Sequence, residues 1–342
     1  MNSRYRKQTL FAGLGESGQE RLRLSTAVLV GCGALGSVIA DSLVRAGVGT
    51  LRLIDRDFVE LSNLQRQVLY DEQDVSQRLP KVIAATEKLR RINSDVHLEP
   101  HVTDFNPGNC LELIAGADVI LDGTDNFETR FLINDAAVET GTPWIHAGCV
   151  GSHGQTMTIR PGVTPCFRCL MPEAPGPGTG DTCDTAGVIG PAVNIMASLQ
   201  VVDALKILSG QRESISPVLR IVDVWSGSFR TLALSSLPAD NCPCCHGTER
   251  LWLRGERGAQ STVLCGRNSV QLTPDVPTRV DFDQIAVRLK PLGEVRQNPF
   301  LLIFRPEDSN CELTLFRDGR VILTGTEDLT VGRSLYARYI GM

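Results

Sequence analysis

The sequence predicts a doubly wound α/β fold with a mostly parallel sheet, followed by a small α+β domain. Short β-branched runs alternate with amphipathic segments between residues 26 and 146, which is typical of parallel sheets. A glycine-rich turn joins the first β-branched run to the first amphipathic segment. With 342 residues the chain is long for one domain and comfortable for two, and it can bury a full core without disulfides.

Strands and helices alternate in the first part of the chain. Thr26–Val30 and Thr50–Asp55 are predicted strands. Between them, Ala34–Ala46 carries apolar residues at helical spacing and is stopped by Gly47. The later elements predicted here are a helix at Lys81–Ile92 and strands at His97–Val102, Asp118–Asp122 and Thr142–His146.

The second half of the chain contains a predicted loop, a long apolar helix and then a separate region of short strands and helices. Residues 173–180 are dense in Pro and Gly and predict a loop. Pro191–Leu208 is apolar nearly all round, so we expect a helix buried in the core or against a partner subunit. A boundary near residue 249 divides a domain over 1–249 from an α+β domain over 250–342. In the latter we expect strands at Thr262–Cys265, Val270–Leu272, Leu301–Phe304, Leu313–Phe316 and Val321–Leu323, and helices at Phe282–Leu289 and Leu329–Ile340.

Composition excludes several classes of protein. The formal net charge is -5, which argues against nucleic-acid binding, because such proteins usually carry a basic face. The polar N-terminus runs into no long apolar stretch, so we expect neither a signal peptide nor a membrane span. A cytoplasmic location follows, and there the 11 cysteines are core residues, metal ligands or nucleophiles more often than disulfides.

A glycine pattern after the first strand predicts a nucleotide site. Gly31, Gly33 and Gly36 form G-x-G-x-x-G between a strand and a helix. The first glycine permits a tight turn, the second lets the backbone approach phosphate, and the helix N-terminus offers free N–H groups. Asp55 ends the next strand, where a carboxylate can accept hydrogen bonds from ribose hydroxyls.

Polar residues at later strand ends favour ATP over a dinucleotide. Arg66 offers a fork for phosphate oxygens, and Lys81 adds a point charge at a helix start. Asp125 follows a strong strand and is placed to hold Mg²⁺. Two alternatives stay open. The first is an NAD-dependent oxidoreductase on the same fold, which would not explain the basic residues or the cysteine pairs. The second is a non-enzymatic binding scaffold, which would not explain why the polar site residues are all present.

Two C-x-x-C pairs predict a structural zinc site. Cys166 and Cys169 form one pair, and Cys242 and Cys245 form the other. Such spacing in a cytoplasmic protein is typical of tetrahedral zinc, here joining distant segments of the chain. Cys244 and His246 are further candidates for the fourth ligand, for which spacing favours Cys245.

These motifs together resemble the ThiF/MoeB/HesA family, prokaryotic relatives of the ubiquitin-activating enzymes. The likeness covers roughly residues 4–246, about two-thirds of the chain. The tail resembles, in size and place, an extension on some family members. The stretches that carry the resemblance are Ala46–Gly49, Leu61–Gln67, the pair Pro80-Lys81, and Gly123–Phe127.

The resemblance implies a Rossmann-like sheet and a reaction. ATP and Mg²⁺ would adenylate the C-terminal Gly-Gly carboxylate of a ubiquitin-like sulfur-carrier protein, and pyrophosphate would leave. Asp55 would hold ribose, Arg66 and Lys81 the phosphates, and Asp125 the metal. The predicted nucleotide shell is completed by Asp57, Asn63, Gln67 and Asn126.

The resemblance also implies a homodimer and a reactive thiol. A basic residue near the N-terminus of one protomer would enter the site of the other. Residues 4–8 read Arg-Tyr-Arg-Lys-Gln, so Lys7 stands where the family usually has Arg, and Arg4, Arg6 and Lys7 all stay candidates. Cys183 is predicted as a nucleophile toward the activated carrier, although the neighbouring carboxylates of Asp181 and Asp184 oppose its ionisation.

The sequence says less about which biosynthetic pathway the carrier serves and about the role of residues 250–342. A thiamine-route carrier (ThiS-like) and a molybdopterin-route carrier (MoaD-like) end alike, and the neighbours of Cys183 narrowly favour the former. For residues 250–342 the alternation of apolar residues supports a fold and no activity, and we expect this domain to help dock or orient the carrier.

Overall fold

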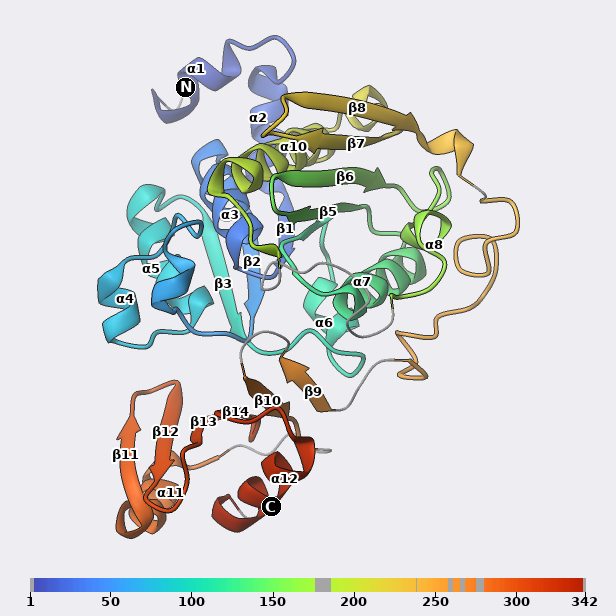
Figure 1. The fold of residues 1–342 in the computed structure, drawn as a ribbon. Coiled ribbons are helices and arrows are strands. Elements are labelled where there is room, and N and C mark those ends of the chain that lie inside the picture. Colours follow the sequence, from blue (N-terminus) through green and yellow to red (C-terminus); the bar gives the residue numbers. More distant parts are fainter. Residues whose placement is uncertain are drawn as a thin grey trace. The chain divides into compact units, whose positions relative to one another are not determined.

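The computed structural model of the chain divides into two compact units, residues 1–257 and residues 258–342 (Figure 1). The residues described below are 3–175, 186–237, 239–257, 261–264, 268–274 and 280–340. Each unit has its own sheet.

The first unit is built on a sheet whose strand order is β3-β2-β1-β4-β5-β6-β7-β8. The first five strands in that order are parallel, as predicted. Order reverses between β1 and β4, so a crevice is expected where their carboxyl ends diverge. The parallel strands are β1 (Thr26–Val30), β2 (Thr50–Asp55), β3 (His97–Val102), β4 (Val119–Asp122) and β5 (Trp144–Val150).

Three antiparallel strands extend this sheet, and the sequence analysis did not identify them. They are β6 (His153–Ile159), β7 (Val218–Asp223) and β8 (Ser228–Ala233). β8 is exposed along most of its length, with Phe229 55% and Leu232 42% exposed. A strand at the sheet edge with both faces wet lacks the regular alternation that marks a half-buried strand.

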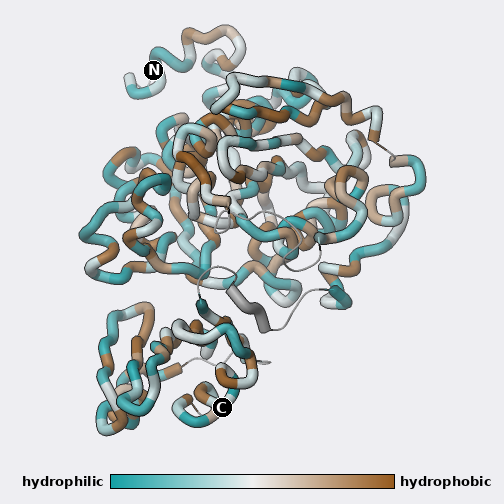
Figure 2. Tube along the Cα trace, in the orientation of Figure 1, coloured by the Kyte–Doolittle hydropathy of each residue, from teal (hydrophilic) through white to brown (hydrophobic). Residues whose placement is uncertain are grey.

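Alternate side chains of the central strands face two apolar cores. Ala27 and Leu29 of β1 pack with α3 (Ala34–Ala46), α5 (Lys81–Ile92) and α10 (Gly190–Leu208). Val28 and Val30 pack on the other side, with α6 (Cys110–Ile114) and α7 (Phe127–Thr140). Figure 2 shows the brown, hydrophobic colouring along these inner strands. Burial on both faces explains why the parallel strands read as continuous apolar runs.

The helix α10 is long and apolar enough to cross a membrane by length and composition. It packs against α3, β5 and β6, and ten of its residues are buried within the unit. It is therefore a core helix, as its all-round apolar sequence predicts.

The remaining helices of the first unit are short or peripheral. They are α1 (Arg6–Thr9), α2 (Gly15–Leu24), α4 (Glu72–Ser76) and α8 (Phe167–Leu170). Tyr5, just before α1, is buried against Gly47, and its hydroxyl accepts a hydrogen bond of 2.8 Å from the Asn93 amide. The N-terminal segment is thus anchored to its own chain.

The second unit is an antiparallel sheet of order β11-β12-β13-β14-β10-β9 with two helices. Leu302, Phe304 and Leu315 point into one core with both helices. Asp318 and Gly319 lie in the turn between β13 and β14. The elements are β9 (Ser261–Leu264), β10 (Ser269–Leu272), α11 (Phe282–Leu289), β11 (Gly293–Gln297), β12 (Leu301–Pro306), β13 (Glu312–Phe316), β14 (Val321–Thr324) and α12 (Leu329–Tyr339).

Candidate active site

The glycine turn between β1 and α3 packs tightly against the end of β4. Gly31 has φ +91°, and a Cβ built on it would lie 2.5 Å from the carbonyl oxygen of Gly123. A Cβ on Gly36 would lie 2.0 Å from the carbonyl oxygen of Gly31. Both positions therefore require glycine, since any side chain would force the backbones apart.

Gly33 differs from its two neighbours because space is open above it. It is the N-cap of α3 and no side chain caps the helix there. A Cβ at Gly33 would find its nearest neighbour, Nε2 of Gln67, 3.9 Å away. The first N–H groups of α3 are thus accessible to an anion, which the helix dipole also favours.

Asp55 braces the glycine turn. Its two carboxylate oxygens accept hydrogen bonds from the backbone N–H of Cys32 at 2.6 Å and of Asp57 at 2.7 Å. Tyr70 donates to the Cys32 carbonyl at 2.7 Å from the other side. Burial raises the pKa of the Asp55 carboxyl, and the nearby Lys81 ammonium opposes that rise. The structure therefore adds a bracing role that the sequence did not indicate. Cys32 is buried, as expected of a packing residue.

Lys81 is brought beside Asp57, and the two form a partly buried ion pair. The Lys81 Nζ lies 3.1 Å from Asp57 Oδ2, and the Lys81 backbone N–H donates to the Asp57 carbonyl at 2.9 Å. The Lys81 side chain is 4% exposed. These two contacts fix the start of α5 to the loop that follows β2. They bring the predicted site residues Asp57 and Lys81 together.

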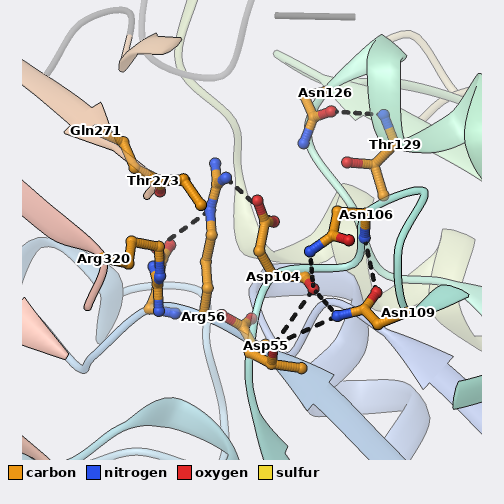
Figure 3. A network of polar contacts seen from close by, with 12 residues as sticks. Asp55, Arg56, Asp104, Asn106, Asn109, Asn126, Thr129, Gln271, Thr273 and Arg320 are labelled. Carbon is orange, nitrogen blue, oxygen red and sulfur yellow. Dashed lines mark hydrogen bonds and ion pairs between the residues drawn. The ribbon is translucent and has the colours of Figure 1, made fainter. Parts of the chain in front are cut away.

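Arg56 is a second cation at this edge that the sequence analysis missed. Its guanidinium lies 3.2 Å from Asp104, which in turn accepts hydrogen bonds at its backbone carbonyl from Asn106 and Asn109 (Figure 3). Although burial opposes it, the surrounding carboxylates, Asp125 among them, raise the pKa of Arg56. Its position directly after Asp55 at a strand end was the available signal.

Asn63 and Gln67 lie on a short turn facing Gly33. The Asn63 side-chain oxygen accepts from the Glu60 backbone N–H at 3.0 Å, which fixes the turn. Gln67 is 3% exposed, and its Oε1 has no hydrogen-bonding partner among the described residues. An orphaned amide oxygen beside an open helix N-terminus is a group that a ligand can satisfy. Arg66 donates to the Ser62 carbonyl at 3.0 Å from the same turn.

Asp125 and Asn126 follow β4, as predicted. Asp125 is exposed, so its carboxylate is free of the packing that holds its neighbours. The Asn126 side-chain oxygen caps α7 by accepting from the Thr129 N–H at 2.8 Å (Figure 3). One acceptor position of this oxygen is therefore used by the helix, and the amide nitrogen is available to a nucleotide.

Four sulfur atoms converge in the first unit at the residues predicted to bind zinc. Sγ of Cys166 lies 3.9 Å from Cys169 and 3.7 Å from Cys242, and Cys169 lies 3.5 Å from Cys245. All four sulfurs lie within 4.8 Å of one another. In a tetrahedral site with Zn–S bonds of about 2.3 Å the sulfurs stand about 3.8 Å apart. The cluster therefore has the dimensions of a zinc site.

Cys244 also contacts Cys166, but it lies outside the group of four mutually close sulfurs and has other neighbours besides. The Cys244 sulfur is buried against α7, where it contacts the Asn134 amide at 3.3 Å and the Asp135 carboxylate at 3.5 Å. His246 is exposed. Hydrogen bonds from neighbouring thiols lower the pKa of Cys166, whereas the resulting thiolate raises the pKa of Cys169. Without a cation, the thiols cannot all ionise together, so a divalent metal suits the set.

Two predicted groups are placed less directly. Arg4 donates to the Ile92 carbonyl of its own chain at 2.9 Å, whereas Lys7 is exposed on α1. Of the three basic candidates in this segment, Arg4 is therefore held in place within its own chain. Cys183 lies outside the described residues.

Comparison with known proteins identifies the family. The ThiF family matches residues 5–244. The sulfur carrier protein ThiS adenylyltransferase of Bacillus subtilis (strain 168) is 46% identical over 342 residues, the full length of both chains. The chain belongs to the ThiF family. The matched residues include the glycine turn and Cys166, Cys169 and Cys242, and Cys245 follows directly after them.

Further relatives agree with this assignment to the ThiF family. The sulfur carrier protein ThiS adenylyltransferase of Escherichia coli (strain K12) is 41% identical over 246 residues, 72% of this chain and 95% of that one. The fold resembles that of Escherichia coli MccB crystallised with ATP, with a TM-score of 0.60, 23% identity, and coverage of 72% of this chain and 75% of that one. None of these named relatives supports the oxidoreductase alternative.

Proposed function

We propose that this ThiF family member uses ATP to adenylate the C-terminal carboxylate of a ubiquitin-like sulfur-carrier protein. The observation that carries the proposal is the convergence of polar groups on the uncapped start of α3. Gln67 lies beside Gly33 there, and the Asp57–Lys81 pair is joined to the same turn through Asp55. The full-length likeness to a ThiS adenylyltransferase supports it.

The reaction needs positioning and charge neutralisation more than acid–base chemistry. A carboxylate oxygen of the carrier forms a bond to the α-phosphorus of ATP, the bond from that phosphorus to the bridging oxygen breaks, and pyrophosphate leaves with the electron pair. The N–H groups at the start of α3, Lys81 and Arg66 would hold the phosphates. Asp125 would hold Mg²⁺, which supplies charge neutralisation at the phosphates when bound.

The cysteine cluster would hold a structural zinc ion. Three of its sulfur separations, at 3.5–3.9 Å, fit a tetrahedral site, all four sulfurs lie within 4.8 Å of one another, and three of the four cysteines are buried. Cys166 is the N-cap of α8 and Cys169 lies within it, whereas Cys242 and Cys245 follow the last strand of the sheet. Zinc would therefore fix the return of the chain after β8.

The proposed partner is the sulfur-carrier protein, and of the two carriers we favour a ThiS-like carrier of thiamine biosynthesis. The same reaction on a MoaD-like carrier for molybdopterin synthesis is the second candidate, since a relative named adenylyltransferase and sulfurtransferase MOCS3, from Sus scrofa, is 38% identical over 275 residues. The β7–β8 hairpin exposes Trp225 at 82% and Phe229 at 55%, a surface suited to a folded protein.

The remaining parts of the proposal concern assembly. A homodimer would let Lys7 of one protomer reach the phosphates bound by the other. The Cys183 thiolate would attack the adenylated carboxyl carbon of the carrier, forming a thioester as AMP leaves, and the domain over 250–342 would help to orient the carrier. We also propose a cytoplasmic location, which the core position of α10 supports.

Exchange of labelled pyrophosphate into ATP tests the function. The protein is mixed with MgATP and, in separate reactions, a ThiS-like carrier, a MoaD-like carrier, or either carrier lacking its last glycine. We expect exchange with an intact carrier, faster for the ThiS-like one, and none with the truncated carriers. Absence of exchange with both intact carriers would contradict the proposal.

A further inference from the structure

The carboxylate of Asp122, at the end of β4, is surrounded by hydrogen-bond donors. It is fully buried, and its Oδ1 accepts from the backbone N–H and the hydroxyl of Thr124, at 2.9 and 2.7 Å. Its Oδ2 lies 3.2 Å from Nε of Arg130 and 2.9 Å from Nδ1 of His146. Although burial alone would raise it, these charges and hydrogen bonds lower the pKa of Asp122. The carboxylate therefore stays ionised.

Thr124 is held at three points by this arrangement. Asp122 binds its N–H and its hydroxyl, and Nη2 of Arg130 donates to its carbonyl oxygen at 2.7 Å. The next residue is Asp125, and Asn126 then caps α7. A residue fixed on one side by a buried carboxylate and on the other by a helix cap has little freedom, so the direction in which Asp125 leaves the sheet is set here.

His146 contributes only one polar contact to the network. It is 1% exposed, and burial lowers the pKa of its imidazole although Asp122 opposes this. The proton of the neutral ring therefore lies on Nδ1, facing Asp122. Nε2 has no hydrogen-bonding partner among the described residues, and the ring packs beside Trp144 and Phe167, with centroids 5.7 and 4.7 Å away. Burying a polar nitrogen without a hydrogen bond costs free energy. The hydrogen bond to Asp122 is therefore the contribution of the His146 side chain to the network.

We propose that Asp122, Arg130 and His146 form a positioning network that aims Asp125 at the magnesium-bound nucleotide. The inference rests on the proposed function, because it assigns a task to Asp125. Asp122 and His146 are positioning residues: they touch Thr124 and each other, and they act on the reaction through the backbone of the loop over residues 123–126. Small displacements of a positioned group are costly to catalysis, about a hundredfold for 1 Å in some enzymes.

Asp203 offers a matched control. It is also fully buried, on α10, and it accepts from the Thr158 hydroxyl at 2.8 Å and from Arg220 at 2.7 Å. Its partners belong to β6, β7 and α10 itself, where Lys206 lies 3.5 Å away, and none of these contacts reaches the loop after β4. Removing its charge tests the loss of a buried ion pair without disturbing Asp125.

The test compares four variants by pyrophosphate exchange and Mg²⁺ titration. Asp122→Asn weakens the hold on Arg130 and His146, and His146→Leu removes one donor. His146→Asn keeps a donor near the Nδ1 position and serves as the conservative rescue, with Asp203→Asn as control. We expect Asp122→Asn and His146→Leu to lower kcat about tenfold and to raise the Mg²⁺ concentration for half-maximal rate, with the carrier KM unchanged. We expect His146→Asn and Asp203→Asn to keep both parameters close to those of the unmodified protein.

Hydrogen exchange of the peptide over residues 123–129 gives a readout without activity. We expect faster exchange of this peptide in Asp122→Asn and His146→Leu and unchanged exchange in Asp203→Asn. Unchanged exchange and unchanged Mg²⁺ dependence in the first two variants would overturn the inference, even if they melt earlier. If the unmodified protein shows no pyrophosphate exchange, the proposed function fails, and hydrogen exchange still decides whether the network fixes the loop.

Discussion

The nucleotide edge of the sheet and the cysteine cluster collect reactive side chains in opposite ways. At the sheet edge, Gly33 leaves a helix start open and Asp125 is exposed. In the cluster, Cys166, Cys169 and Cys242 are buried and their sulfurs already stand at the separations of a bound metal. An open site suits a ligand that binds and leaves, whereas a closed site suits one that stays and stabilises the fold.

The two regions lie at different points of one helix, α7, so the residues for the reaction and the residues for stability are separated within the same unit. The N-terminus of this helix follows Asp125, and its middle carries Asn134, which contacts the sulfur of Cys244 and accepts from the backbone N–H of Phe167 at 2.8 Å. Changes at the sheet edge should therefore alter activity first, and changes at the cluster should alter stability first.

Loss of the metal should have the largest effect on stability. Replacing Cys169 by Ser removes one of four ligands, and we expect zinc to be lost and the free energy of unfolding to fall by several kcal/mol, because metal binding and folding are coupled. Metal analysis and thermal melting measure this. Cys110→Ser, at a buried thiol outside the cluster, should keep its zinc. A Cys169→Ser protein with a full complement of zinc would break the distinction between the two regions.

Removal of the exposed carboxylate at the sheet edge should act on rate alone. We expect Asp125→Ala to slow pyrophosphate exchange about a hundredfold, equivalent to about 2.7 kcal/mol, with an unchanged melting temperature. Glu128→Ala, at an exposed position in the first turn of α7, is the control and should exchange at the normal rate. Equal rates for both variants would show that Asp125 has no role in the reaction.

Two glycines of the same turn should separate packing from ligand binding. A Cβ at Gly36 would lie 2.0 Å from the Gly31 carbonyl oxygen, so we expect Gly36→Ala to destabilise the unit by about 2 kcal/mol. Gly33→Ala meets no atom within 3.8 Å and should fold normally while binding ATP more weakly. Calorimetry and melting curves measure both effects. A Gly33→Ala protein that binds ATP as the parent does would place the phosphates elsewhere.

The smallest predicted effect is a pH dependence of stability from His146. Burial lowers its pKa in the folded protein below the unfolded value near 6.5, so the unfolded chain binds a proton more readily between the two values. Stability therefore falls as the pH drops below about 6.5, with a slope of at most about 1.4 kcal/mol per pH unit for this one group. His146→Asn should show a shallower loss between pH 7 and pH 5 in melting experiments. Identical slopes for the two proteins would contradict a buried, neutral imidazole.

Local patterns made much of this fold predictable. Thr26–Val30, Ala34–Ala46 and Lys81–Ile92 occur with the predicted bounds, because β-branched runs, helical spacing and a preceding proline are signals within a few residues. Strand β6 was missed because it buries Gly154, Thr156 and Thr158 in place of a run of large apolar residues, and β8 was missed because it is exposed.

Site residues that belong to a local sequence motif could be predicted, whereas contacts between residues far apart in the sequence could not. The cysteine spacing predicted the four clustered sulfurs, but adjacent Cys244 could be separated from Cys245 only by seeing that it contacts Asn134 and Asp135. The network around Asp122 joins His146, which is 24 residues away in sequence. No spacing rule links a strand end to a residue on the next strand, so that contact required the fold.

The central claim is that the open edge of the sheet activates a carrier carboxylate by adenylation, and label transfer tests it most directly. The protein is incubated with a carrier ending in Gly-Gly and with ATP labelled at either the α- or the γ-phosphate. We expect the carrier to acquire label from the α-phosphate only, and Asp125→Ala to slow this transfer about a hundredfold. Label acquired from the γ-phosphate, or from neither with an intact carrier of each kind, would contradict the claim.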